Sequence, residues 1–216
     1  MEKDKEIKDT LRQCRKPTGP GGKKIVERMN ESHSEVTDWG LRLVSIPKDG
    51  ILLDAGCGGG YTLEKLAQAA PLGKVFGIDY SEDCIDWANL YNQERIEKGT
   101  VQVLQSDVSN TPFPSDYFHL ITAIETVYFW PDMIGAFLEM KRILSPGGIF
   151  LIINTSYPSE AFKERNAVYE EQGNLVIPSP EQLTEWLKEA GFQRIKIELR
   201  EEKNWLCCIA DRNDGQ

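Results

Sequence analysis

Apolar residues along the chain gather in short runs that recur between amphipathic segments. Seven runs rich in β-branched and aromatic residues have the length of strands: Ile51–Asp54, Lys74–Asp79, Val101–Gln105, Phe118–Ile124, Ile149–Ile153, Gln193–Leu199 and Trp205–Ala210. Helical periodicity separates several of them, at Tyr61–Gln68, Asp83–Ile96, Met133–Leu144 and Pro180–Ala190. This alternation predicts βαβ units, and therefore an α/β fold with a mostly parallel sheet covered on both faces.

The end of the chain departs from the parallel pattern. Only Arg200 to Asn204 separate the last two predicted strands, which is too short for a crossover helix. One of these strands must therefore run antiparallel. Earlier in the chain, Ser81 is expected to cap a helix, and the run Ser145-Pro146-Gly147-Gly148 is expected to stop a helix and turn into the fifth strand.

Two segments lie outside the alternation. Residues 1–50 are predicted to form helices interrupted at 16–22, and residues 154–179 form a long excursion of the kind that often covers the ends of strands. We therefore expect one domain over residues 1–216. Its parts are an N-terminal helical cap (1–50), a binding core (51–153), a lid (154–179) and a C-terminal helix with a hairpin (180–216).

Charge and composition exclude several classes of function. The 216 residues carry a net charge of −9, and residues 1–24 hold the only basic excess, eight Lys or Arg against four Asp or Glu. An acidic surface repels phosphate backbones, so we expect no nucleic-acid partner. We expect no secretory signal, because the first residues contain no apolar stretch, and no membrane span, because no apolar run is long enough. Five cysteines without CxxC spacing and two distant histidines favour a reducing cytoplasm and no metal site.

A glycine-rich loop follows the first predicted strand and opens the first helix. It reads Asp54-Ala55-Gly56-Cys57-Gly58-Gly59-Gly60-Tyr61, a D-x-G-x-G-x-G pattern. Glycines let the backbone approach a ligand without a Cβ in the way. A dinucleotide fingerprint would need a third glycine where Tyr61 stands, and no Gly-Lys-Ser/Thr follows to form a phosphate loop.

Acidic residues lie at the ends of the first two predicted strands and just after the third. Asp54 suits a neighbouring ammonium or sulfonium better than a pyrophosphate. Asp79 lies 19 residues after Gly60, where an acid can accept both hydroxyls of a ribose. Asp107 is placed to accept from an adenine amino group while Val108 packs against the ring, although an Asx turn is the alternative role for Asp107. Together these residues describe a cationic nucleoside without phosphates.

These motifs resemble the class I S-adenosylmethionine-dependent methyltransferases, in the small-molecule branch labelled methyltransferase type 11 or UbiE-like. The matching segments are Leu52–Gly60, Gly77–Ser81, Ser106-Asp107, Pro112–Pro114, Ala123–Asp132 and Leu144–Gly148. The resemblance implies strand order 3-2-1-4-5-7-6 with strand 7 antiparallel. It further implies S-adenosyl-L-methionine as the cofactor, a small-molecule methyl acceptor and release of S-adenosylhomocysteine. The residues implied to bind the cofactor are Asp54, Gly56, Gly58, Gly60, Asp79, Tyr80, Asp107, Val108 and Glu125.

The sequence departs from the family pattern in two places. His119 stands where relatives usually carry Asp before the fourth strand. Glu125-Thr126-Val127-Tyr128 stands where the amino-methyltransferases of nucleic-acid bases and of protein glutamine carry Asn-Pro-Pro-Tyr, which disfavours those substrates.

Candidates for catalysis and acceptor binding lie mostly outside the matching segments. His33 and Glu125 are the catalytic candidates, with His33 as a base or a contact to the donor's carboxylate; a structural helix-end histidine and a solvated strand-end acid are the alternatives. Tyr128 and Tyr157 are the substrate candidates, with Trp130 and Tyr169 as further possible walls, and core packing is their alternative role.

Two other functions remain open at this stage. One is a protein that binds S-adenosylmethionine or S-adenosylhomocysteine without catalysis, because the three acids suit both a binder and an enzyme. The other is a nucleotide-dependent oxidoreductase, which Asp54 and Tyr61 disfavour. The sequence carries no prediction of oligomeric state.

Overall fold

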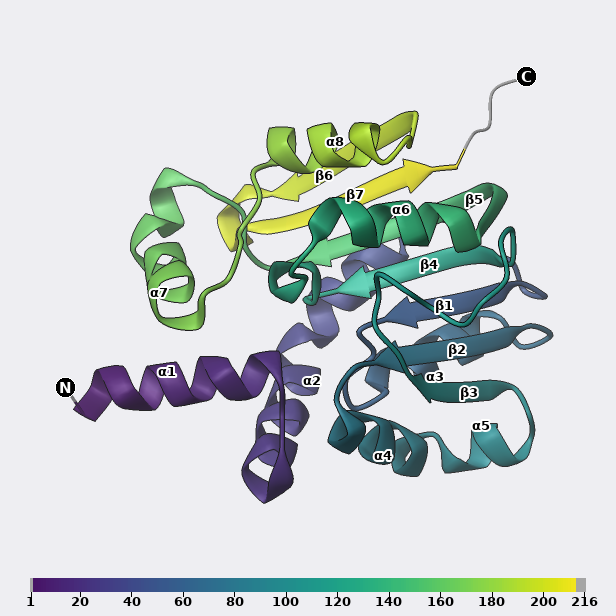
Figure 1. Cartoon of the computed structure of the whole chain (residues 1–216), viewed down its shortest axis with the longest axis horizontal. Helices are drawn as coiled ribbons and strands as arrows, with labels where there is room; N and C mark the ends of the chain where they lie inside the picture. The colour runs from purple at the N-terminus through teal and green to yellow at the C-terminus, as the bar shows by residue number, and fades with distance from the viewer. Residues whose placement is uncertain (1, 213–216) are drawn as a thin grey trace.

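A twisted sheet of seven strands runs through the computed structural model, which describes residues 2–212, with side chains from residue 7 onward (Figure 1). The strands are β1 (Ile51–Ala55), β2 (Lys74–Asp79), β3 (Val101–Gln105), β4 (Phe118–Ile124), β5 (Leu144–Asn154), β6 (Arg194–Arg200) and β7 (Trp205–Asp211). Their order is β3-β2-β1-β4-β5-β7-β6, and β7 is antiparallel to both of its neighbours. The predicted fold class and strand order are confirmed.

Helices cover both faces of the sheet, and each face has its own apolar core. The helices are α1 (Glu2–Arg15), α2 (Gly19–Leu41), α3 (Tyr61–Ala69), α4 (Glu82–Tyr91), α5 (Gln93–Glu97), α6 (Met133–Ile143), α7 (Lys163–Gly173) and α8 (Pro180–Glu189). Alternate residues of one strand belong to opposite cores, as Leu52 and Leu53 show: Leu53 lies in the core that includes Phe137 of α6, and Leu52 lies in the core that includes Leu66 of α3. Each fully buried Leu or Phe contributes about 1.5–3 kcal/mol, so these two cores fix the sheet that carries the site.

One predicted helix is wrong, because the segment Asp83–Ile96 is divided at Asn92 into α4 and α5. Asn92 leaves the helical conformation at φ −105° and ψ 19°. Its buried side chain donates to the carbonyl oxygens of Gly60 and Ala88, at 2.9 and 3.0 Å. The asparagine thus ties the helix to the glycine loop, a tertiary contact that periodicity does not reveal.

The turn predicted at residues 145–148 lies inside β5. Helix α6 ends at Ile143, and β5 begins at Leu144 with an irregularity in its pairing to β4. Gly147 has φ +75°, and its N–H donates to the carbonyl oxygen of Arg212 at 2.7 Å. The glycines therefore bend the strand while its pairing with the end of β7 continues.

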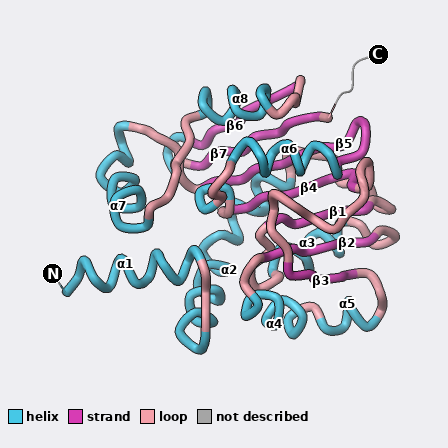
Figure 2. Tube along the Cα trace, viewed as in Figure 1, coloured by secondary structure: helices cyan, strands magenta, loops and turns pink. Residues whose placement is uncertain are grey.

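The N-terminal helices and the predicted lid lie near the carboxyl ends of the strands. In Figure 1 the arrowheads of β1 and β4 point toward α1 and α2. Figure 2 shows a short loop between α1 and α2, whereas the prediction placed the interruption over residues 16–22. Helix α7 of the predicted lid packs against α1. None of the helices in residues 2–212 is long and apolar enough to cross a membrane.

Candidate active site

A cavity of about 330 Å³ opens where the parallel strands end. One part of its wall comes from the strand ends and the loops after them, and the other comes from the N-terminal cap. The strand-end wall includes Asp54, Gly56, Gly58, Asp79, Tyr80, Asp107, Val108, Glu125, Thr126 and Phe129, and the cap wall includes Cys14, Arg15, Pro17, Val26, Met29, Asn30 and His33. Ligands of open α/β sheets bind at this position, and the size is in the range of small-molecule sites.

The glycine loop is fastened to the neighbouring strand and leaves room beside one glycine. The N–H groups of Gly56 and Cys57 both donate to the carbonyl oxygen of Ile78, at 2.8 and 2.9 Å. A Cβ on Gly56 would lie 2.1 Å from Oγ1 of Thr126, whereas a Cβ on Gly58 would meet nothing within 4 Å. Gly58, with φ +50°, therefore presents bare backbone to open space at the cavity, as a loop that receives a ligand closely requires.

Asp79 connects the glycine loop to the start of α4. Its Oδ2 accepts from the N–H of Gly58 at 3.0 Å, and its Oδ1 accepts from the N–H of Ser81 at 2.9 Å. Burial raises the pKa of this carboxyl, while the backbone N–H donors act in the opposite direction. The carboxylate is thus oriented by rigid backbone at the rim of the cavity.

Asp54 lies deeper, at the end of β1, and is almost fully buried. Its Oδ1 accepts from the hydroxyl of Thr122 on β4 at 2.6 Å. Burial raises its pKa to about 7, with a smaller opposing effect from Thr122 and a further upward effect from Asp79. A buried carboxyl of this kind gains most from a nearby cation.

Asp107 forms the Asx turn that was one of its two expected roles, and it lies at the cavity. Its Oδ1 accepts from the N–H and the hydroxyl of Ser109, at 2.8 and 2.7 Å, which is an Asx turn. The residue also lines the cavity next to Val108. The turn orients the carboxylate and occupies only one of its two oxygens.

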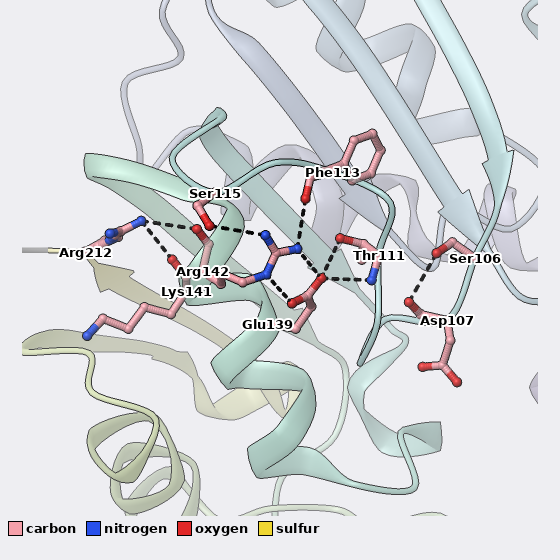
Figure 3. Close-up of polar contacts among 9 residues, drawn as sticks. All are labelled: Ser106, Asp107, Thr111, Phe113, Ser115, Glu139, Lys141, Arg142 and Arg212. Atoms are coloured by element: carbon pink, nitrogen blue, oxygen red, sulfur yellow. Dashed lines mark hydrogen bonds and ion pairs between the residues drawn. The ribbon is translucent and has the colours of Figure 1, made fainter.

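The loop that carries Asp107 is held from behind by Glu139 of α6 (Figure 3). Oε1 of Glu139 accepts from the N–H and the hydroxyl of Thr111, at 2.8 and 2.6 Å. Arg142 pairs with both carboxylate oxygens and also donates to the carbonyl oxygen of Phe113 at 2.9 Å. The pKa of Glu139 is lowered, because the donors of Arg142 and Thr111 outweigh its burial. This charge-assisted network stabilises the loop that carries Asp107.

His33 and Glu125 come from different elements and meet at the cavity. His33 lies on α2, Glu125 follows β4, and the atoms His33 Nε2 and Glu125 Oε2 are 3.7 Å apart. The side chain of His33 is 27% exposed and that of Glu125 is 13% exposed, so both are partly buried and remain accessible to solvent. The structure thus brings the two catalytic candidates together.

Three predicted site residues lie away from the cavity wall. Tyr128 and Tyr157 are buried in the protein, and Tyr157 belongs to the core that α6 and α8 cover. Gly60 faces α4, because a Cβ there would lie 2.9 Å from the Cα of Ala88. Core packing, the alternative role of the two tyrosines, is the one that this structure favours, and Gly60 serves helix packing.

The cavity has wall residues that sequence reasoning missed. Met29 and Phe129 give it apolar surface, and Cys14 to Pro17 cover its side next to Tyr80. The Tyr80 hydroxyl donates to the carbonyl oxygen of Arg15, and the Ser81 hydroxyl donates to that of Pro17 at 3.0 Å. The only sequence signal for this covering segment was its position in a cap outside the βα alternation.

Gly58 and Gly60 of the loop should respond differently to alanine. Gly60→Ala combines a φ of +82° with overlap against α4, and we expect it to lower the free energy of unfolding by about 2–4 kcal/mol. Gly58→Ala should cost only the backbone strain of about 1–2 kcal/mol. Its new Cβ stands beside the cavity, so it should weaken S-adenosylhomocysteine binding by roughly tenfold or more. Urea unfolding and calorimetric titration measure the two effects; equal stability losses for both variants would contradict this assignment.

Comparison with known proteins identifies the family. The family described as methyltransferase domain matches residues 53–152. Demethylmenaquinone methyltransferase of Staphylococcus aureus (strain JH9) is 31% identical over 168 residues, covering 67% of this chain and 68% of that protein. A similar fold occurs in a chain of the complex between the Haloferax volcanii methyltransferase activator Trm112 and a methyltransferase. The TM-score is 0.76 at 19% identity, and the match covers 87% of this chain and 93% of that one. Geranyl diphosphate C-methyltransferase of Streptomyces coelicolor, solved with S-adenosylhomocysteine, has a TM-score of 0.68 and 18% identity, and the match covers 91% of this chain and 87% of that one. The chain therefore belongs to the class I S-adenosylmethionine-dependent methyltransferases.

Proposed function

We propose that this enzyme holds S-adenosylmethionine along the strand-end wall and a small-molecule acceptor under the cap. In this arrangement Asp107 and Val108 meet the adenine, Asp79 accepts from the ribose hydroxyls, and the bare backbone at Gly58 allows close approach. Asp54 and Glu125 lie toward the cationic methionine end. When bound, the donor supplies an electrophilic methyl group on a positively charged sulfur.

One observation carries this assignment. Three carboxylates at the ends of three successive parallel strands line a single cavity beside a glycine around which the space is open. A phosphorylated nucleotide would be repelled by Asp54, Asp79 and Asp107, whereas a cationic nucleoside is favoured by them. These residues fit the donor of the family.

The chain's own contribution is positioning and exclusion of water. Val26 and Met29 give the cap side of the cavity an apolar surface, and Phe129 adds to it from the strand-end wall, which suits the body of an organic acceptor. Aligning a nucleophile with the S–CH₃ bond supplies effects that reach ~7–11 kcal/mol in well-oriented model systems. We propose His33 as the group that takes the acceptor's proton, with Glu125 beside it.

The deciding experiment is calorimetric titration of the full chain with S-adenosylmethionine, S-adenosylhomocysteine and NAD. We expect binding of the first two and none of the third. Steady formation of S-adenosylhomocysteine in a metabolite extract should accompany donor binding, because the chain is an enzyme. Binding of NAD, with no binding of S-adenosylmethionine or S-adenosylhomocysteine, would refute the assignment of the donor site.

A further inference from the structure

The backbone at Glu125 is in an unusual conformation that side-chain contacts sustain. Glu125 has φ +57°, in the left-handed region that residues with a Cβ rarely adopt. Its N–H donates to the carbonyl oxygen of Ile153 at 2.9 Å, so the strained residue is fastened to β5. Such conformations persist only where surrounding contacts over-determine them, and they cluster at functional sites.

The contacts that hold Glu125 come from two residues outside the predicted catalytic pair. Oε1 accepts from the N–H of Thr155 and from the hydroxyl of Tyr128, the latter at 3.3 Å. Oε2 accepts from the hydroxyl of Thr155 at 2.7 Å. Arg165 of the predicted lid donates to the carbonyl oxygen of Thr155 at 3.1 Å. Both oxygens of the carboxylate are therefore held by hydrogen bonds, and Oε2 also lies 3.7 Å from Nε2 of His33.

Tyr128 is suited to a permanent donor role. Its hydroxyl accepts from the N–H of Ser156 at 3.0 Å, which fixes the phenolic oxygen. Its own hydrogen has two acceptors within reach, Oε1 of Glu125 at 3.3 Å and the carbonyl oxygen of Ser156 at 3.5 Å, and the charged and nearer carboxylate is the stronger one. Burial, and next the charge of Glu125, raise the pKa of this phenol well above its usual range. The hydroxyl therefore stays protonated and continues to donate.

The contacts of Tyr128 and Thr155 with Glu125 influence which ring nitrogen of His33 carries the proton. Nε2 is the atom that faces Glu125 Oε2, at 3.7 Å. Hydrogen bonds at catalytic sites commonly shorten only when the reacting complex forms. A carboxylate at this place favours the tautomer with its proton on Nε2, and that tautomer leaves the lone pair of Nδ1 free.

We propose that Tyr128 and Thr155 are positioning residues that orient Glu125 and, through it, hold His33 in the Nε2–H tautomer, so that Nδ1 accepts the acceptor's proton. The inference rests on the proposed function and deepens it. As the acceptor atom forms its bond to the methyl carbon, the S–CH₃ electron pair stays on sulfur. The acceptor's proton moves to Nδ1, and His33 becomes an imidazolium next to the carboxylate of Glu125.

The test is the long-range ¹H–¹⁵N NMR spectrum of the full chain with ¹⁵N-labelled histidine, saturated with S-adenosylhomocysteine. At about pH 9 imidazole side chains are neutral, so the spectrum reports tautomers. The chain has only two histidines, and His119 is an internal reference, because its Nδ1 accepts from the N–H of Ile51 at 3.0 Å. His33→Gln assigns the signals.

We expect the Nε2–H tautomer to dominate at His33 in the parent protein. Tyr128→Phe should lower the tautomer ratio roughly fivefold, the equivalent of one hydrogen bond, and Thr155→Val should do the same. His119 should not change in either variant. Tyr117→Phe is the matched control, since it removes a phenolic hydroxyl just before β4, at the opposite end of the strand that Glu125 follows.

Each failure can be told apart. If His33 carries its proton on Nδ1, or if neither variant that folds changes the ratio, the positioning role is overturned. Calorimetry on the same samples tests the proposed function separately. Absence of S-adenosylhomocysteine binding would refute the donor site. Binding together with an unchanged tautomer ratio of His33 would refute only the positioning role of Tyr128 and Thr155.

Discussion

Replacing Asp79 with alanine is expected to weaken S-adenosylhomocysteine binding by at least ~100-fold, with the fold retained. The carboxylate is oriented by the N–H groups of Gly58 and Ser81 at the rim of the cavity, and we propose that it accepts from both ribose hydroxyls. Hydrogen bonds to a charged group contribute about 1.5–3 kcal/mol each, so losing two exceeds the ~2.7 kcal/mol that a 100-fold change requires. Calorimetric titration of parent and variant measures the ratio.

Two variants make that measurement specific. Asp79→Asn keeps the shape and one acceptor oxygen, so its loss of affinity should be intermediate. Asp107→Ala should cost less than Asp79→Ala, because in the proposed arrangement Asp107 accepts from one adenine amino group, whereas Asp79 accepts from two ribose hydroxyls. Thermal unfolding checks that each protein is folded. An Asp79→Ala protein that is folded and binds as tightly as the parent would remove ribose recognition from this residue.

Local sequence was sufficient to predict which acidic residues gather at the strand-end wall of the cavity. Parallel strands end at one edge of a sheet, so the acids Asp54, Asp79 and Asp107 had to converge once the alternation of strands and helices was recognised. Gly60 shows the limit of this reasoning. Its place in the motif indicated a ligand contact, but the structure uses it for close packing against α4 and a hydrogen bond with Asn92.

The cap side of the cavity could not be predicted in the same way, because contacts between residues distant in sequence determine it. The covering segment at Cys14 to Pro17 depends on Tyr80 and Ser81, more than sixty residues later. Tyr128 follows a strand end as a ligand-binding residue would, yet its ring turns inward and its hydroxyl serves Glu125. Periodicity identifies the element that carries an aromatic residue, but it does not tell a cavity wall from a core.

The second large effect concerns Asp54 and the pH dependence of stability. The folded protein raises the pKa of Asp54 to about 7, whereas an unfolded aspartate titrates near ~3.9. The folded state therefore holds this proton more tightly, and the free energy of unfolding should fall as pH rises from about 4 to about 7. At ~1.4 kcal/mol per pH unit the contribution is roughly 4 kcal/mol, which is a large part of the ~5–15 kcal/mol of a typical domain.

Asp54→Asn should remove this dependence, because asparagine accepts from Thr122 without carrying a charge. At pH 8 we expect the variant to be about 2–4 kcal/mol more stable than the parent, and the gain should vanish near pH 4, where aspartate is protonated in both states. Urea unfolding at several pH values measures the difference. Ile121→Val on the adjacent strand is the control, because it changes no ionisable group. Its loss of about 0.5–1.5 kcal/mol in the free energy of unfolding should therefore be the same at every pH. A stability difference for Asp54→Asn that did not vary with pH would contradict the burial of an ionisable carboxyl here. The buried charge of Asp54 destabilises the free protein, but it stabilises the complex with a cationic donor. This is a physical reason for a donor site to hold an aspartate in the core.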